Sequence, residues 1–270
     1  MSQTINTYNP PSRGNHDRTK IGADYYDEAA DGKERDSYYA PIVDTFKKSD
    51  GAGLFKNLHD LLSRTHKPPG ELPGDILYST VDRRPDGALY YLYSGEGPKN
   101  EDQAKARNSR DLESYNLEHV VPKSWFEAEL PMRDDLHHLF TEQRKCNSDR
   151  GNLPFDEVSG STTELPSCGI VRNTHGKAFE PHAGKGEVAR AILYFVTRHP
   201  GEVGDRSDEM TIADLPRLLE WHKEFPVTDY ERHRNETIQD VQGNRNPFID
   251  FPGLAEQVDF RPGFGPTNNR

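Results

Sequence analysis

Glu118, His119 and Asn147 are residue types that together could hydrolyse a phosphodiester with the help of a metal ion. Carboxylate and amide oxygens are hard ligands that suit Mg²⁺ or Ca²⁺, and Mg²⁺ takes only one or two protein ligands beside water and substrate phosphate. A neutral imidazole beside that ion can take a proton from the attacking water, provided that its other nitrogen is held as a donor, often to a backbone carbonyl. The residues therefore predict a metal held by Glu118 and Asn147, with His119 as the general base.

A short strand is expected to carry the carboxylate and the imidazole. Residues 117–121 are apolar apart from this pair, and they stop at Pro122, which cannot donate a ladder hydrogen bond. Neighbouring residues of a regular strand point to opposite faces. Glu118 and His119 can therefore serve one pocket only if the strand ends or bulges there, which the proline favours.

A second strand and a helix are expected to bring Asn147 to the same place. Residues 136–140 are the candidate strand, and residues 141–150 are predicted to form a helix that Thr141 caps and Gly151 ends. The order strand, strand, helix would then place the amide of Asn147 beside the end of the first strand.

Three arginines are candidates to contact the phosphates of a nucleic acid. Arg144 and Arg150 each lie three residues from Asn147 and so share its face of the predicted helix. Arg245 lies in residues 243–250, a segment rich in Gly, Asn and Pro that is predicted to be a turn with a charged tip rather than a strand or helix. The alternative is surface charge for the first two and a structural turn for the third.

The sequence resembles the bacterial endonuclease I family of the ββα-metal (His-Me finger) nucleases. The resemblance rests on EHVVP at 118–122, DLHHLF at 135–140 and the pattern N-x-x-R-G-N-L-P-F at 147–155. The segments KGEVARAILYF, LLEWH and QGNRNPFID extend it, so that it covers roughly residues 35 to 255. It implies an α+β fold with a ββα-metal core and surrounding helices.

The resemblance also implies an activity. It implies a largely sequence-nonspecific endonuclease that acts on DNA, with RNA as a further candidate substrate, and leaves 5′-phosphate and 3′-hydroxyl ends. It assigns His119 as the base and Glu118 and Asn147 as ligands of one Mg²⁺ per active site, with Ca²⁺ or Mn²⁺ as alternatives. Some members carry a phosphate-stabilising arginine in a long insertion before the DLH segment. Only residues 122–134 occupy that place here, so the identity of this arginine stays open.

Two other interpretations remain. A non-catalytic nucleic-acid-binding protein on the same fold would lack metal-dependent cleavage. A zinc enzyme would draw its ligands from a set of histidines and cysteines that lacks the close paired spacing of structural zinc motifs: His137, His138, Cys146, Cys168, His175 and His182.

Three tyrosines on a predicted strand, Tyr90, Tyr91 and Tyr93, could stack on bases, although strand tyrosines more often pack structurally.

Composition limits how a nucleic acid could be bound. The formal net charge is −11, from 45 acidic and 34 basic residues, which is the wrong overall sign for a nucleic-acid binder. Any binding surface must therefore be a local basic patch. The hydrophobic fraction of 32% and the mean hydropathy of −0.94 predict a modest core, and 22 Gly and 20 Pro predict generous loops. No apolar run is long enough to cross a bilayer, so we expect no membrane contact. We also expect a monomer.

One domain is expected over residues 25–255, between a disordered N-terminal tail at 1–24 and a C-terminal tail at 256–270. The first twenty residues lack the apolar core of a signal peptide, whereas the family suggests an extracellular or periplasmic protein, so the compartment is left open. Cys146 and Cys168 could pair or remain free thiols.

Elsewhere the patterns predict mainly helices. Five segments are predicted to be helices, residues 36–48, 52–66, 185–197, 211–225 and 228–242, and the clearest helical spacing of apolar residues is that of the leucines in residues 52–66. The last begins with a capping box of Thr228 and Glu231. Residues 76–81 and 88–93 are predicted to be strands on either side of a turn, and residues 156–184 show too little periodicity for any element.

Overall fold

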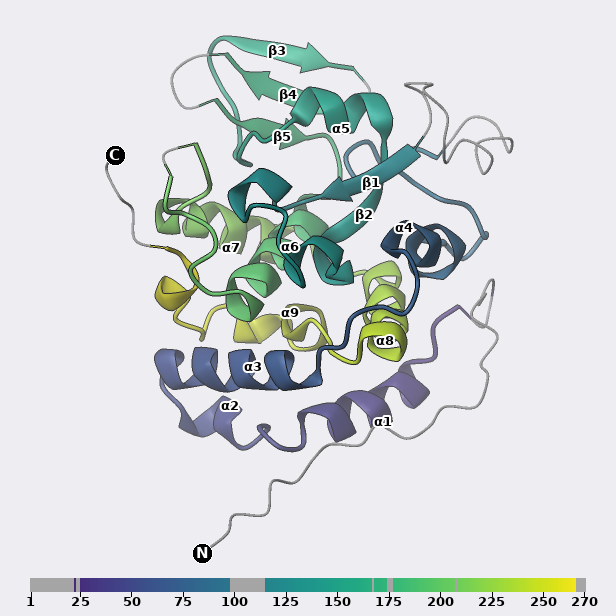
Figure 1. The fold of residues 1–270 in the computed structure, drawn as a ribbon, viewed down its shortest axis with the longest axis vertical. Helices are drawn as coiled ribbons and strands as arrows, with labels where there is room; N and C mark the ends of the chain where they lie inside the picture. The colour runs from purple at the N-terminus through teal and green to yellow at the C-terminus, as the bar shows by residue number, and fades with distance from the viewer. Residues whose placement is uncertain are drawn as a thin grey trace, which may run out of the picture.

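A long buried helix, α6 (Lys185–Arg198), runs through the middle of the molecule (Figure 1). The computed structural model describes residues 22, 25–97, 115–166, 168–173, 177–206 and 208–265. Most side chains of α6 are buried, because the segment is apolar on nearly all sides and other elements must surround it. The helix predicted at 185–197 is thereby confirmed.

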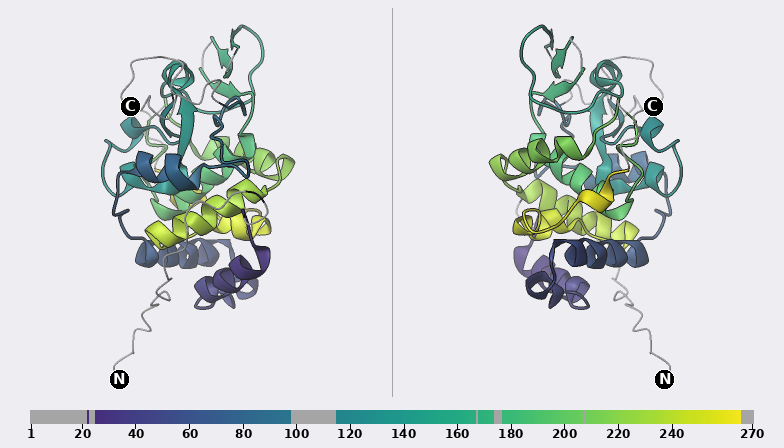
Figure 2. Two further views of the ribbon diagram at one scale, coloured as in Figure 1. Left: turned by 90° about the vertical axis from the view of Figure 1, so that its right-hand side faces the viewer. Right: turned by 90° about the vertical axis from the view of Figure 1, so that its left-hand side faces the viewer.

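Helices cover α6 on several sides. α3 (Gly51–Thr65) and α7 (Leu215–Glu224) pack directly on it, as does the short α9 (Pro247–Asp250). The helices α1 (Glu28–Tyr39) and α2 (Thr45–Lys48) lie beyond α3, at the end of the molecule opposite the sheets (Figures 1 and 2). Two antiparallel sheets at the other end complete a mixed α+β fold, as predicted.

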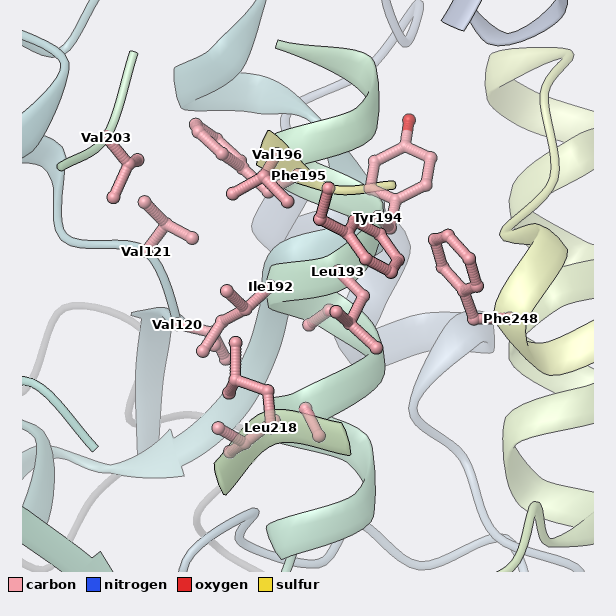
Figure 3. Close-up of a cluster of buried hydrophobic side chains, with 14 of the residues drawn as sticks. Val120, Val121, Ile192, Leu193, Tyr194, Phe195, Val196, Val203, Leu218 and Phe248 are labelled. Atoms are coloured by element: carbon pink, nitrogen blue, oxygen red, sulfur yellow. The ribbon is translucent and has the colours of Figure 1, made fainter. Parts of the chain in front are cut away.

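The segment that follows the first strand is anchored to α6. Val120 and Val121 are fully buried and lie beside Ile192 in the central apolar cluster, which Figure 3 shows. Burial of such side chains contributes about 1.5–3 kcal/mol each. The chain just after Glu118 and His119 is therefore fixed to the most buried helix of the protein.

Two strands and a helix follow one another around Asn147. β1 (Tyr115–His119) pairs antiparallel with β2 (Leu139–Gln143), and α5 (Arg144–Arg150) begins directly after β2. The predicted second strand was placed too early, because residues 136–138 form a 3₁₀ turn that Asp135 caps. Thr141 lies in β2 and bonds to Asp82 instead of capping α5.

The ends of two helices agree with the sequence. Gly151 ends α5 with a φ of 57°, and its N–H donates to the Asn147 carbonyl. α8 (Asp229–Gln242) begins with the capping box of Thr228 and Glu231 and ends at Gly243, whose φ is 85°. These signals are local, so neighbours distant in sequence do not override them.

The three-stranded sheet was not predicted. β3 (Thr162–Leu165), β4 (Gly169–Arg172) and β5 (Phe179–Pro181) pair antiparallel within the stretch that showed no periodicity. Its strands are short and β3 is mostly exposed, so no alternation of apolar residues marks it. A buried disulfide between Cys146 of α5 and Cys168 beside β4, with Cα atoms 5.5 Å apart, joins the two regions and settles the state of the two cysteines.

The two strands predicted at 76–81 and 88–93 are wrong, although the turn predicted between them at 85–87 is present. Residues 73–76 form the short helix α4 (Pro73–Ile76), which continues as a π-helical turn over Leu77–Val81. Of the expected pairing, the described residues contain a bridge between Arg83 and Leu89 and a hydrogen bond from the Arg84 N–H to the Ala88 carbonyl. Burial of the apolar side chains of this segment against Leu136 and Ile238 outweighs its β-forming composition.

Three further expectations are corrected. The first helix begins at Glu28, where Asp27 caps it, and a break separates it from α2. The segment 243–250 contains the helix α9 rather than a turn alone. Residues 256–265 are not a tail, because Phe260 and Phe264 are buried in the main core. The predicted tail at 1–24, apart from residue 22, and residues 266–270 lie outside the described part of the chain.

Candidate active site

His119 is the last residue of β1 and is only partly buried. Its Nε2 lies 2.9 Å from the carbonyl oxygen of Arg133. A carbonyl can only accept, so Nε2 carries the proton and Nδ1 is left as the atom that can accept one. Burial lowers the pKa of His119 to about 3, and the nearby His138 acts in the same direction, so the ring is neutral at neutral pH.

Glu118 is almost fully buried, with 1% of its surface exposed. Its Oε1 accepts hydrogen bonds from the Tyr93 hydroxyl at 2.6 Å and from Arg150 Nη1 at 3.1 Å. Burial raises the pKa of Glu118 to about 7, against the opposing effects of Arg150 and Tyr93. Two donors thus hold one oxygen of this carboxylate.

Asn147 lies on α5 with its side chain against β1. Its Nδ2 donates to Asn116 Oδ1 and to the Leu117 carbonyl, both at 3.0 Å. Because the amide nitrogen faces these acceptors, the amide oxygen points away from them. Asn147 therefore contacts the two residues that precede Glu118, so the predicted amide lies against the strand that carries the predicted carboxylate.

This donor set fits a hard divalent cation. A carboxylate and an amide oxygen are the ligands that Mg²⁺ and Ca²⁺ prefer, and Mg²⁺ keeps water in most other positions. Burial raises the pKa of the Glu118 carboxyl to about 7, and a cation beside it would favour its charged form. The amide nitrogen of Asn147 is already bound to the strand, so the orientation of the amide is set.

Arg150 is buried against the end of β1 rather than exposed on the surface. Its guanidinium pairs with Glu118 and donates to the carbonyl oxygens of His119 and Val120 at 3.2 and 2.9 Å. It also stacks over the ring of Phe155, with 4.4 Å between the guanidinium carbon and the ring centre. With 1% of its surface exposed, Arg150 supports the site from within, and we do not retain it as a phosphate contact.

The other two predicted arginines lie in different settings. Arg245 is fully buried between α1 and α9, where its guanidinium pairs with Asp31 and Asp250. It has no exposed nitrogen for a phosphate, so the predicted contact at Arg245 is not supported. Arg144 is half-buried in the first turn of α5, three residues before Asn147.

Sequence reasoning overlooked three participants. Tyr93 was considered for base stacking, yet it is fully buried and donates to Glu118, while the backbone of Arg133 orients His119. Nothing in the sequence marks either contact. Lys123 is exposed in the turn after Pro122. Burial has the largest effect on both pKa values, raising that of Glu118 and lowering that of His119, and the charge of Lys123 lowers both. Its place directly after EHVVP was a signal that could have been used.

Within the described ranges, the histidines and cysteines of this set do not form a zinc site. Cys146 and Cys168 are bonded to each other, and the Nε2 atoms of His137 and His138 lie 3.2 and 2.7 Å from backbone carbonyls. In the part of the chain that the structure describes, no three His, Cys, Asp or Glu side chains are arranged to hold a metal. His175 lies outside that part.

Comparisons with known proteins identify the family of the chain. The model of the endonuclease I family matches residues 53–253, which include Glu118, His119 and Asn147. An extracellular ribonuclease of Bacillus subtilis is 33% identical over 240 residues, covering 81% of this chain and 80% of that protein. An extracellular ribonuclease of Bacillus amyloliquefaciens is 34% identical over 58% of each chain. A periplasmic deoxyribonuclease of Aeromonas hydrophila is 30% identical, covering 44% of this chain and 48% of its own length.

Proposed function

The chain belongs to the endonuclease I family and is a nuclease, and on this premise we propose that it cleaves DNA and RNA with one divalent ion held by Glu118 and Asn147. The proposal is supported by three side chains that are held on or against β1. They are the buried carboxylate of Glu118, the anchored amide of Asn147 and the neutral, oriented imidazole of His119. The names of the relatives include both ribonucleases and deoxyribonucleases, which supports both substrates.

In this mechanism His119 accepts the proton of the attacking water. Its Nδ1 is the accepting atom, since Nε2 donates to the Arg133 carbonyl, and the lowered pKa keeps the ring neutral before the reaction. A divalent ion, when bound, would neutralise charge on the phosphoryl oxygens and the leaving oxygen. Asn147 and Glu118 are held by β1, Tyr93 and Arg150, so little reorganisation is needed when substrate arrives.

We assign the phosphate contacts to Lys123 and Arg144. Lys123 is exposed and close enough for its charge to act on both Glu118 and His119, and Arg144 lies in the first turn of α5. Contacts to phosphates carry no base information, so little sequence preference is expected. Both cations are local, which fits a protein whose net charge is −11.

Replacing Lys123 by Ala is expected to raise the KM for DNA several-fold and to leave metal affinity unchanged. The loss of one phosphate contact should also reduce the slope of log affinity against log salt by about 1. Cleavage rates measured at salt concentrations from about 50 to about 200 mM test the change in KM and in salt slope. The matched control is Lys48→Ala on α2, at the opposite end of the molecule (Figure 1). Equal KM and salt slope in the two variants would remove Lys123 from the binding surface.

The activity itself is tested by incubating purified protein with plasmid DNA and with RNA in Mg²⁺, Mn²⁺, Ca²⁺ or EDTA. We expect cleavage that needs a divalent ion and leaves ends that DNA ligase can rejoin, which requires 5′-phosphate and 3′-hydroxyl groups. Sequenced cut sites should show little base preference. Undiminished cleavage in EDTA would contradict the metal, and strong base preference would contradict recognition through phosphates.

We further propose that the protein acts outside the cytoplasm. The Cys146–Cys168 disulfide is buried, and such bonds form and persist in oxidising compartments. The relatives from Bacillus are named extracellular and the one from Aeromonas periplasmic. No helix within the described ranges is long and apolar enough to cross a membrane.

A further inference from the structure

Tyr93 is a fully buried tyrosine that is fixed at both of its ends. Its backbone N–H donates to Glu142 Oε2 at 2.7 Å, and its ring packs edge-on against Phe179 with centroids 5.1 Å apart. The hydroxyl, at the far end, donates to Glu118 Oε1 at 2.6 Å. A side chain held in this way delivers its hydroxyl to one point in the molecule, and that point is the carboxylate of Glu118.

The same oxygen of Glu118 accepts a second hydrogen bond, from Arg150 Nη1 at 3.1 Å. Two donors from separate elements therefore converge on Oε1. They restrict rotation of the carboxylate about its Cγ–Cδ bond, and they leave Oε2 as the oxygen that can bind a metal ion. Hydrogen bonds to a charged acceptor are stronger than those between neutral groups, so the arrangement is stiff.

We propose that Tyr93 is a positioning residue for metal binding: with Arg150 it holds Glu118 Oε1, so that Oε2 is presented to the divalent ion. This inference rests on the proposed function. Groups that orient a ligand typically change metal affinity 10- to 100-fold when removed. Tyr93 itself touches neither metal nor substrate, and it acts only through Glu118.

The test is Tyr93→Phe, which removes the hydroxyl and keeps the ring on Phe179 and the backbone contact to Glu142. Mn²⁺ titrated by calorimetry, without substrate, should bind about 10- to 100-fold more weakly than in wild type. The Mg²⁺ concentration for half-maximal cleavage should rise to a similar extent, while kcat at saturating Mg²⁺ stays close to wild type. Loss of a hydroxyl that only stabilised the fold would not weaken metal binding while leaving kcat at saturating Mg²⁺ unchanged.

The chain offers a matched control in Tyr39→Phe. The Tyr39 hydroxyl donates to Asp250 Oδ2 at 2.8 Å, and Asp250 is paired with Arg245, so a buried tyrosine again bonds to a carboxylate held by an arginine. This second cluster joins α1 and α9, away from β1 (Figure 1). We expect Tyr39→Phe to lower stability about as much as Tyr93→Phe and to leave Mn²⁺ affinity unchanged.

The outcomes separate the inference from the function on which it rests. If Tyr93→Phe binds Mn²⁺ as wild type does while Glu118→Gln does not, the positioning role is wrong and the metal assignment stands. If Glu118→Gln also binds normally, the metal assignment itself fails. The rise in melting temperature that Mn²⁺ produces is also measured on every variant. Because a ligand that binds only the folded protein raises its stability, this rise reports the Mn²⁺ affinity of Tyr93→Phe even if the variant is less stable than wild type.

Discussion

Replacing His119 by Ala is expected to slow phosphodiester cleavage about 10²- to 10⁴-fold at saturating Mg²⁺, the range over which a general base contributes. The reason is geometric, because Nε2 is held by the Arg133 carbonyl and Nδ1 is the only ring nitrogen that can accept the proton of water. Metal affinity should stay close to wild type, since the ion is assigned to Glu118 and Asn147. Single-turnover cleavage of a supercoiled plasmid measures the effect.

His222→Ala is the matched control for this variant. His222 Nε2 lies 2.9 Å from the Pro252 carbonyl, so the control removes an imidazole that is held in the same way but lies on α7. It should lower stability without changing the cleavage rate. Cleavage by His119→Ala within a few-fold of that control would mean that another group activates the water.

Replacing Arg150 by Met should destabilise the protein by about 3–5 kcal/mol, the usual cost of removing one partner from a buried ion pair. The change leaves Glu118 buried without the guanidinium that pairs with it, and it also removes the hydrogen bonds to the carbonyl oxygens of His119 and Val120. Urea unfolding measures the free energy. A surface arginine that only contacted phosphates would show almost no loss of stability and a change in salt dependence instead.

Arg190→Met provides the comparison for Arg150. Arg190 and Glu231 form another fully buried pair, between α6 and α8, so its loss should be similarly destabilising. Only Arg150→Met should also weaken Mn²⁺ binding, because only that pair contains a proposed metal ligand. Equal metal affinity in the two variants would show that the Arg150 contact does not help to shape the site.

What the sequence could predict was determined by how far each signal reaches along the chain. The capping box at Thr228, the glycine after α5 and the apolar pattern of α6 are local, and each was read correctly. The requirement that one nitrogen of His119 be held by a carbonyl followed from chemistry, and the structure contains that bond. That Asn147 lies on a helix packed against the strand of Glu118 needed only the order of elements.

The arginines show where such reasoning ends. Arg245 lies in a polar, turn-like stretch, yet it is buried because Asp31, 214 positions earlier, folds back onto it. Arg150 shares a helix face with Asn147 as predicted, but that face is turned inward onto β1, which helical spacing cannot reveal. Tyr93 likewise reaches Glu118 across a stretch of chain that carries no pattern. Burial of a charged residue depends on partners that only the tertiary fold supplies.

The most direct test of the central claim is a calorimetric titration of Mn²⁺ into wild type, Glu118→Gln, Asn147→Ala and His119→Ala. One site per chain is predicted in wild type, with affinity lost or greatly weakened in the first two variants and retained in His119→Ala. Equal affinity in all four proteins would contradict a cation held between the strand carboxylate and the helix amide.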